Sequence, residues 1–169
     1  MKLLIFGATG GTGAQLLAQA LDAGHDVTVV ARNPDKIPAH HRDRSVIVPG
    51  DVLQARTWDA VTGGHDAVLS CLGSRDRRHP TVIYSQGTAN IIGAMRMALM
   101  EGIVTASPLD WTIIRPPMLT DRPPTGRYRA AAGHHLPDQK SISRADLAHY
   151  MLNHIEDQKT WKKIVWPSG

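Results

Sequence analysis

Short apolar runs alternate along this chain with longer amphipathic stretches. The first run, Leu3–Phe6, is continuously apolar, which predicts a strand buried on both faces of a parallel sheet. From Thr12 the apolar residues recur at helical spacing, and Gly24 predicts the end of that helix. A strand followed directly by a helix indicates the opening unit of an α/β fold.

The same alternation continues to the end of the chain. Apolar runs predict strands over 26–30, 45–48, 66–71, 111–115 and 163–166, and amphipathic stretches predict helices over 51–62, 81–101 and 143–156. Ser143 is the expected cap of the last helix. The stretch 121–137, rich in Pro, Gly and Arg, predicts a long loop over a ligand face. We therefore expect a doubly wound, Rossmann-like α/β fold, with helices on both faces of a parallel sheet and a single domain over residues 1–169.

Glycines at GxxGxxG spacing separate the first strand from the first helix. In that context Gly7, Gly10 and Gly13 allow a tight turn, a close approach of the backbone to a pyrophosphate, and close packing of helix on strand. The free amides and the positive dipole end of the helix then face the phosphates. The pattern predicts a dinucleotide site. Hydroxyl and backbone contacts to the phosphates are expected from Thr9, Gly11 and Thr12, although ordinary turn and cap roles are the alternative for the two threonines.

The residues after the second strand bear on the choice between NAD and NADP. An acidic residue there hydrogen-bonds the ribose 2′-hydroxyl of NAD, whereas an arginine accommodates the 2′-phosphate of NADP. This chain has Arg32 at that place and Lys36 one turn further on, with no carboxylate at the strand end. We expect NADPH as the cofactor; the alternative for Arg32 is a solvated surface side chain.

Further candidate cofactor residues follow the third and fourth strands. The side chain of Asp51 or the backbone of Val52 is placed to contact the adenine, and Asp51 is equally suited to cap the helix expected over 51–62. The two roles are compatible. Leu72 and Gly73 follow the fourth strand, where a cofactor can lie against the backbone. In the basic stretch that comes next, Arg75 is placed to hold an anionic group, with a solvated loop as the alternative.

Composition narrows the class of protein. With 42% hydrophobic and 20% charged residues and no apolar run long enough for a membrane span, the chain is typical of a soluble globular protein. Cys71 is the only cysteine, so no internal disulfide forms, and a cytoplasmic location is expected. The net charge of +4 comes from scattered basic residues without interleaved aromatics, which favours small anionic ligands over nucleic acid. The two His-His pairs lack metal-ligand spacing, so no metal site is expected.

Several short segments occur together in one known group of proteins. They are Gly7–Gly13, Gly50–Gln54, Leu72–Arg75, Leu109–Thr112, Arg115–Pro117 and Thr125–Tyr128. On these segments the chain resembles atypical short-chain dehydrogenases of the biliverdin reductase B and flavin reductase type, related to NmrA-like NAD(P)-binding proteins. The resemblance implies a Rossmann fold, NADPH binding and reduction of flavins, biliverdins or similar planar acceptors. Pro117 and Met118 are further candidates, expected to line the nicotinamide end of the site.

Members of this group lack the Tyr-xxx-Lys pair of typical dehydrogenases, and this chain lacks it too. The residues four places after Tyr84, Tyr128 and Tyr150 are threonine, alanine and histidine. We therefore assign no catalytic residue, and solvent has to supply the proton.

The chain departs from the group near residues 97–99. Two helices that the group separates by a strand and a loop are joined there, and the expected segment beside the nicotinamide is absent. Met118 also replaces a histidine of the group. Either the segment is truly deleted or it is missing from this sequence, which we favour; an intact mass above 18.4 kDa decides between them.

These observations predict an enzyme that transfers a hydride from NADPH to a small planar acceptor, as a monomer or weak homo-oligomer without nucleic-acid or membrane partners. The alternative is a non-catalytic, NmrA-like sensor that binds NADP and acts on a protein partner. A sugar-nucleotide epimerase is disfavoured because Tyr-xxx-Lys and a substrate domain are absent.

Overall fold

A computed structural model describes residues 1–73, 82–83, 85–96 and 109–169. The chain divides into two compact units, residues 1–103 and 104–169, and each is described by itself. The single domain expected over residues 1–169 stays a prediction. In the described part of the chain, no helix has the length and apolar character needed to cross a membrane.

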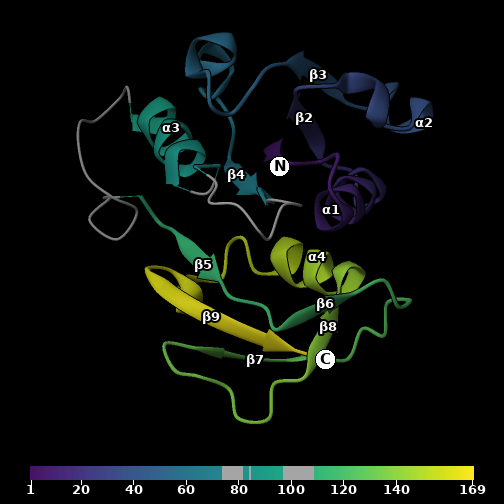
Figure 1. The fold of residues 1–169 in the computed structure, drawn as a ribbon, viewed down its shortest axis with the longest axis vertical. Helices are drawn as coiled ribbons and strands as arrows, with labels where there is room; N and C mark the ends of the chain where they lie inside the picture. Colours follow the sequence, from purple (N-terminus) through teal and green to yellow (C-terminus); the bar gives the residue numbers. More distant parts are fainter. Residues whose placement is uncertain (74–81, 84, 97–108) are drawn as a thin grey trace. The chain divides into compact units, whose positions relative to one another are not determined.

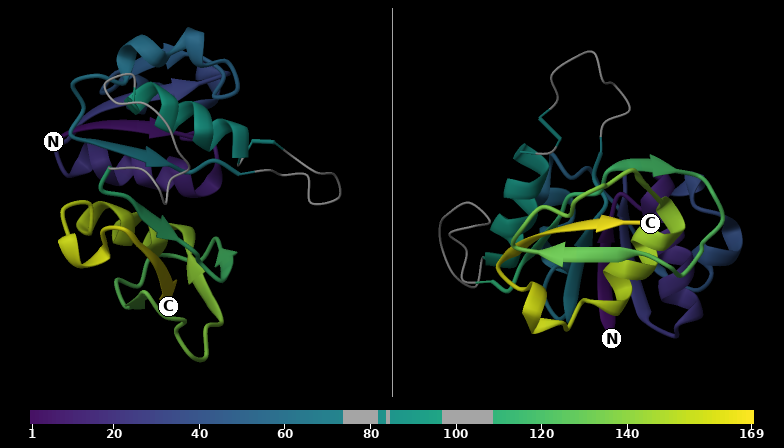
Figure 2. Two further views of the ribbon diagram at one scale, coloured as in Figure 1. Left: turned by 90° about the vertical axis from the view of Figure 1, so that its left-hand side faces the viewer. Right: turned by 90° about the horizontal axis from the view of Figure 1, so that it is seen from below.

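The first unit is built on a four-stranded parallel sheet (Figure 1). Its strands have the order β3-β2-β1-β4, and Leu4 of β1 pairs with Thr28 of β2 on one side and Val68 of β4 on the other. The left view of Figure 2 shows these strands side by side. All four predicted strands are confirmed to within one residue at each end. Their bounds are β1 (Lys2–Phe6), β2 (Asp26–Ala31), β3 (Val46–Pro49) and β4 (Ala67–Ser70).

Helices α1 (Gly11–Asp22) and α3 (Ser85–Arg96) lie on opposite faces of this sheet (Figure 1). Side chains of β1 alternate between the faces, so Leu4 and Phe6 pack with Ile91 of α3. Phe6 also meets the ring of Trp58 edge-on, with 4.7 Å between the ring centroids. Both faces of the strand are thereby buried, which is why its sequence is apolar throughout.

Four short helical segments connect the remaining strands of the first unit. After β2 come η1 (Pro34–Lys36) and α2 (Ala39–Arg42), and after β3 come η2 (Ala55–Thr57) and η3 (Asp59–Val61).

The helix predicted over 51–62 is therefore wrong. The hydroxyls of Thr57 and Thr62 each donate to the carbonyl three residues earlier, at 2.7 Å, and compete with an α-helical ladder. Trp58, at φ −149°, separates the two short turns.

The first helix matches its expected span, and α3 covers the middle of the helix expected over 81–101. Residues 97–101 of that prediction lie outside the described residues, as does the basic stretch 74–80.

The second unit contains two small sheets and one helix. Strands β5 (Thr112–Ile114) and β9 (Lys163–Ser168) are parallel, and β7 (Arg129–Ala132) runs antiparallel to β9 (Figure 2, right). Strands β6 (Met118–Thr120) and β8 (Ser141–Ser143) form a parallel pair. The uninterrupted loop expected over 121–137 is wrong, because β7 lies within it.

Helix α4 (Arg144–Asn153) follows β8, and the short turn η5 (Gln158–Thr160) precedes β9. The predicted cap is confirmed, since Ser143 accepts a hydrogen bond from the amide of Asp146 at 2.9 Å. The helix ends three residues before the expected Glu156. Its last carbonyls are taken by side chains: Asn153 donates to the carbonyl of His149 at 2.9 Å, and the His154 ring contacts the carbonyl of Tyr150 at 2.9 Å.

Candidate dinucleotide site

The turn between β1 and α1 holds two glycines that the local packing requires. Gly7 adopts φ +81°, and a Cβ there would lie 2.6 Å from the carbonyl oxygen of Cys71. A Cβ on Gly13 would collide with the carbonyl of Gly7. The helix thus packs directly on the end of the strand, as the glycine pattern predicts.

Gly10 differs from its two neighbours in the motif. It has an extended backbone (φ −88°, ψ 164°), which every residue type can adopt. A Cβ there would meet only the carbonyl oxygen of Gly7, at 3.3 Å. The fold therefore tolerates a side chain at this position better than at the other two.

The first turn of α1 presents open backbone donors. The amide of Ala14 bonds the carbonyl of Gly10 at 2.8 Å and begins the helical ladder. The amides of Gly11, Thr12 and Gly13 have no acceptor among the described residues, and no side chain caps this end. The hydroxyls of Thr9 and Thr12 likewise have no partner within the described ranges. This arrangement suits a bound phosphate, which such amides and the helix dipole attract.

The chain after β2 brings positive charge to the same carboxyl edge of the sheet. Arg32 and Lys36 are both exposed, and neither forms an ion pair with any residue that the structure describes. The segment is held in place by Ile37, which is only 1% exposed. Asp35 lies between the two cations and pairs with Arg42 at 3.0 Å. Sequence reasoning named Arg32 and Lys36 but missed the Asp35–Arg42 pair.

The turn after β3 is fixed by its own hydrogen bonds. Asp51 accepts from the amide of Leu53 at 2.9 Å through its carboxylate, and from the indole of Trp58 at 2.8 Å through its carbonyl. The carbonyl of Val52 accepts from the side chain of Asn90 at 2.8 Å, and the Val52 side chain is buried. Asp51 thus closes a tight turn, and the α-helix it was expected to cap does not form.

The segment after β4 lies beside the glycine turn. The amide of Cys71 bonds the carbonyl of Phe6 at 2.9 Å, and Leu72 packs against α3 at Gly87. Gly73 is exposed. Burial raises the pKa of the Cys71 thiol to about 12, which leaves little of the reactive thiolate at neutral pH.

Because all four strands are parallel, their carboxyl ends meet at one edge. The structure brings together there the candidate residues of the first unit: Gly7, Thr9, Gly10, Gly11, Thr12, Gly13, Arg32, Lys36, Asp51, Val52, Leu72 and Gly73. Arg75 lies outside the described residues. Pro117 and Met118 belong to the second unit, where Met118 begins β6 and is 67% exposed.

The second unit has a buried carboxylate that sequence reasoning gave no ligand role. Asp146 is 2% exposed and accepts hydrogen bonds from the amides of Thr125 and Gly126 at 2.9 Å and from the hydroxyl of Ser143 at 2.9 Å. Burial favours the neutral carboxyl, but these hydrogen bonds outweigh it and lower the pKa of Asp146. The side chain therefore anchors the Thr125–Tyr128 segment to the start of α4.

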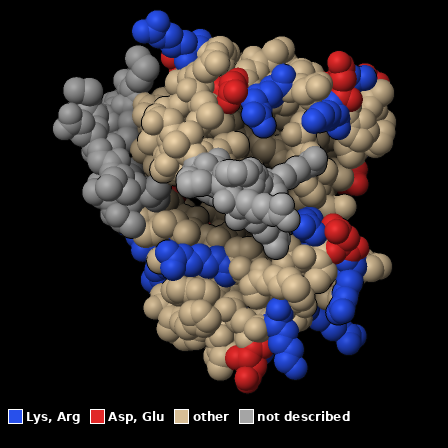
Figure 3. Space-filling view, in the orientation of Figure 1, with Lys and Arg blue, Asp and Glu red and all other residues tan. Residues whose placement is uncertain are grey.

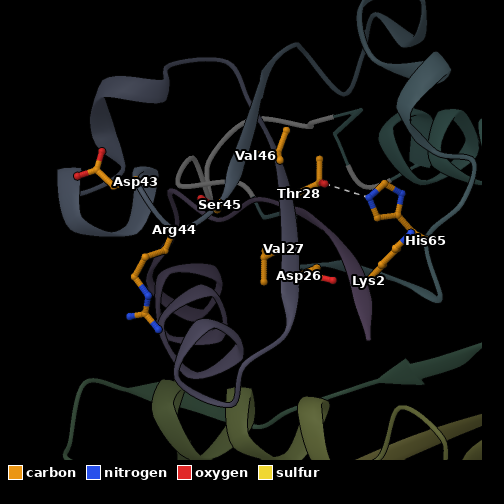
Figure 4. A pocket seen from close by; sticks show the side chains of 9 residues that line it. All are labelled: Lys2, Asp26, Val27, Thr28, Asp43, Arg44, Ser45, Val46 and His65. Atoms are coloured by element: carbon orange, nitrogen blue, oxygen red, sulfur yellow. Dashed lines mark hydrogen bonds between the residues drawn. The ribbon is translucent and has the colours of Figure 1, made fainter.

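Two pockets flank the first unit. One of about 510 Å³ lies at the amino ends of the strands and includes Lys2, Asp26, Thr28 and His65 (Figure 4). His65 contacts the Thr28 hydroxyl at 3.0 Å. This pocket is at the sheet edge opposite the glycine turn, so it is not part of the dinucleotide site. The other, of about 430 Å³, is lined by residues 53–57 and Asn90 and adjoins the Asp51 turn.

Charge on the face shown in Figure 3 is mixed. Lys and Arg side chains lie interspersed there with Asp and Glu, and they form no continuous basic stripe among the described residues.

The fold and the glycine turn define a dinucleotide-binding Rossmann protein. Comparison with known families agrees: residues 7–107 and 97–158 match the NAD(P)H-binding family, and the chain belongs to that family. Its cofactor class is therefore a nicotinamide dinucleotide.

The chain is also similar to a curated protein and to several solved structures. It is 29% identical over 106 residues to the photosystem II assembly factor Ycf39 of Synechocystis sp., an alignment that covers 62% of this chain and 32% of that protein. The chain thus matches about a third of the length of that relative.

Among solved structures, a Rossmann-fold NAD(P)-binding family protein from Shigella flexneri has a TM-score of 0.82 at 23% identity, covering 99% of this chain and 92% of that one. ChuY, an anaerobilin reductase from Escherichia coli O157:H7, has a TM-score of 0.79 at 19% identity, covering 99% and 97%. At these identities the structural matches establish the fold.

Proposed function

We propose that this protein is an NADPH-dependent reductase that transfers a hydride to a small planar acceptor such as a flavin, a biliverdin or a quinone. The observation that carries the proposal is the open turn at Gly10, together with three amides behind it and the Arg32 side chain at the same sheet edge, none of which has a partner among the described residues. These groups fit a pyrophosphate and a 2′-phosphate, respectively.

The preference for NADPH rests on Arg32 and Lys36. A hydrogen bond between a charged arginine and the 2′-phosphate contributes about 1.5–3 kcal/mol, which corresponds to roughly ten- to hundredfold in affinity. NADH has a hydroxyl at that position and gains no such interaction. Asp51 and the Val52 turn, beside the pocket of about 430 Å³, are the groups proposed to border the adenine.

The bound nicotinamide supplies the hydride, and the protein orients the cofactor and excludes water. No general acid is assigned at this sheet edge, because the chain has no Tyr-xxx-Lys pair. Solvent is the proposed proton source. The planar acceptor class is supported by the group resemblance of the sequence and by the similarity in fold to an anaerobilin reductase.

The second candidate function is a non-catalytic NADP sensor that acts on a protein partner. Two observations favour it: the relative named as an assembly factor, and the family-relative gap near residues 97–99, which removes groups expected beside the nicotinamide. The cofactor site of the first unit serves this function equally well.

The test begins with parallel titrations of the purified full chain with NADPH and NADH, followed by nucleotide fluorescence. We expect NADPH to bind about tenfold or more tightly, and the Arg32→Ala variant to lose that preference while NADH affinity stays the same. Equal affinity of the wild-type protein for both nucleotides would refute the proposed NADPH preference.

Turnover then separates the two functions. NADPH oxidation, followed by its absorbance in the presence of FMN, biliverdin or a quinone, identifies a reductase. Tight NADPH binding with no consumption in the presence of any acceptor identifies the sensor. An intact mass above 18.4 kDa would show that the segment missing near residues 97–99 is present in the protein.

A further inference from the structure

The segment that follows β2 contains one negative charge among its positive ones. Between Arg32 and Arg42, Asp35 is the only acidic residue, and it lies next to Lys36 in the chain. A carboxylate in this region has two effects on cofactor choice: it repels the dianionic 2′-phosphate of NADPH, and it can accept a hydrogen bond from the 2′-hydroxyl of NADH. Both effects oppose the preference that Arg32 confers.

In the structure the Asp35 carboxylate forms an ion pair with Arg42. Arg42, the last residue of α2, extends back to η1, and its Nη1 lies 3.0 Å from Oδ1 of Asp35. The side chain of Arg42 is 37% exposed and that of Asp35 is 90% exposed, so the pair lies at the surface.

The backbone that holds the pair is well anchored. The side chain of Asn33 caps η1 by accepting from the amide of Asp35 at 3.2 Å. Ile37, buried at 1% exposure, fixes the chain between η1 and α2. Asp35 in η1 and Arg42 in α2 are therefore brought together by the Asn33 cap and the buried Ile37 side chain.

We propose that Arg42 is a specificity-determining residue: it neutralises Asp35 and so leaves the net positive charge of Arg32 and Lys36 to select the 2′-phosphate. Arg42 acts through Asp35 and is a positioning residue. This inference rests on the proposed NADPH preference. It adds that Arg42 maintains this preference by neutralising Asp35.

The test uses the full chain and two nucleotides, NADPH and NADH, titrated at low and high salt. For Arg42→Gln we expect the preference for NADPH over NADH to fall about two- to fivefold at low salt, the range typical of an exposed charge pair. NADH affinity does not fall, because a freed Asp35 is compatible with a 2′-hydroxyl. At about 1 M salt the effect disappears, since screening then acts within roughly 3 Å.

Arg44→Gln is the matched control. Arg44 pairs with Asp22 at the same 3.0 Å distance and with similar side-chain exposures, 47% and 72%, but its partner lies in α1, outside the segment that follows β2. The nucleotide preference of this variant stays at the wild-type value.

The double variant Asp35→Asn/Arg42→Gln separates charge compensation from direct contact. Removal of both partners restores the wild-type preference if Arg42 acts by neutralising Asp35. A double variant as impaired as Arg42→Gln overturns the inference, because Arg42 then contacts the phosphate itself. An equal loss of affinity for both nucleotides in Arg42→Gln also overturns it, since that is the signature of a purely structural role.

Titration of the wild-type protein with NADPH and NADH distinguishes failure of this inference from failure of the proposed NADPH preference. If it prefers NADPH and Arg42→Gln leaves the preference unchanged, only the inference about Arg42 is overturned. If it binds NADPH and NADH equally, the proposed NADPH preference fails first and the inference falls with it.

Discussion

Substitution of the motif glycines by alanine should separate folding from cofactor binding. At Gly10 the added Cβ meets only the Gly7 carbonyl oxygen, at 3.3 Å, and the backbone is extended. Alanine is a poorer N-cap than glycine, but it also lowers the entropy of the unfolded chain, and each effect is about 0.5–1 kcal/mol. The free energy of unfolding should therefore change by less than about 1 kcal/mol.

Cofactor affinity, unlike stability, should change strongly in Gly10→Ala. The methyl group added in Gly10→Ala would occupy the proposed path of the pyrophosphate to the backbone, so NADPH affinity should fall at least about tenfold, or 1.4 kcal/mol. NADH affinity should fall by the same factor, because the pyrophosphate is common to both nucleotides.

Gly13→Ala is the contrasting variant. Its Cβ collides with the carbonyl of Gly7 and would lie 2.9 Å from Cα of Ala8, so α1 has to move away from β1. Overpacking of this kind costs about 1–3 kcal/mol, or a fall in melting temperature of roughly 2–12 °C for a chain of this size. Urea unfolding and thermal melts measure both variants.

Gly93→Ala is the control for the substitution itself. Gly93 lies in α3, and a Cβ there has no other atom within 4 Å. Alanine should stabilise the helix by up to about 1 kcal/mol and leave nucleotide affinity unchanged. Wild-type NADPH affinity in Gly10→Ala would refute the placement of the pyrophosphate at Gly10, and destabilisation as large as that of Gly13→Ala would refute the packing argument.

Three further measurements test the packing within each of the two units. Asp146→Asn should lower the free energy of unfolding by about 1–3 kcal/mol at pH 7; because the pKa of Asp146 is lowered in the folded state, its stabilisation is present above its ordinary value of 3.8 and is lost as the pH falls. Urea unfolding from pH 7 to 3 should therefore show the difference from wild type shrinking below about pH 4, and a constant difference would contradict the assignment. Trp58→Phe removes the donor to the Asp51 carbonyl and should cost about 1–3 kcal/mol, whereas unchanged unfolding in urea would show that water replaces the indole. Cys71, with its pKa raised to about 12, should react with a disulfide reagent at pH 8 at least about 100-fold more slowly in the native protein than in urea, and equal rates would contradict the raised pKa.

The sequence predicts the four strands of the first unit closely because each is a short apolar run bounded by glycine or proline. The helix expected over 51–62 fails for reasons that the pattern does not contain. Trp58 leaves the helical path to pack on Phe6 and to donate to the Asp51 carbonyl. Once its ring is in the core, the two threonine hydroxyls close short turns on either side. Tertiary packing here overrides local propensity.

The second unit shows the same limit for strands. Residues 129–132 read Arg-Ala-Ala-Ala, which has little intrinsic preference for a strand. They form β7 because β9 offers an antiparallel ladder in which Ala131 pairs with Trp166 and is buried. A single-sequence pattern cannot supply that partner, so Pro, Gly and Arg in the neighbourhood predict a loop instead.

Cofactor selectivity at the end of β2 depends on a sum of charges rather than on one residue. The sequence identifies Arg32 and Lys36 because they follow a strand at the position where nucleotide-binding folds meet the ribose. Asp35, which lies between them in the chain, reduces the formal charge of these three side chains from +2 to +1. The structure adds Arg42 from the next helix at 3.0 Å from Asp35, which offsets that negative charge. This tertiary contact supports the proposed NADPH preference, and its removal should shift the preference toward NADH because Asp35 then keeps an uncompensated negative charge.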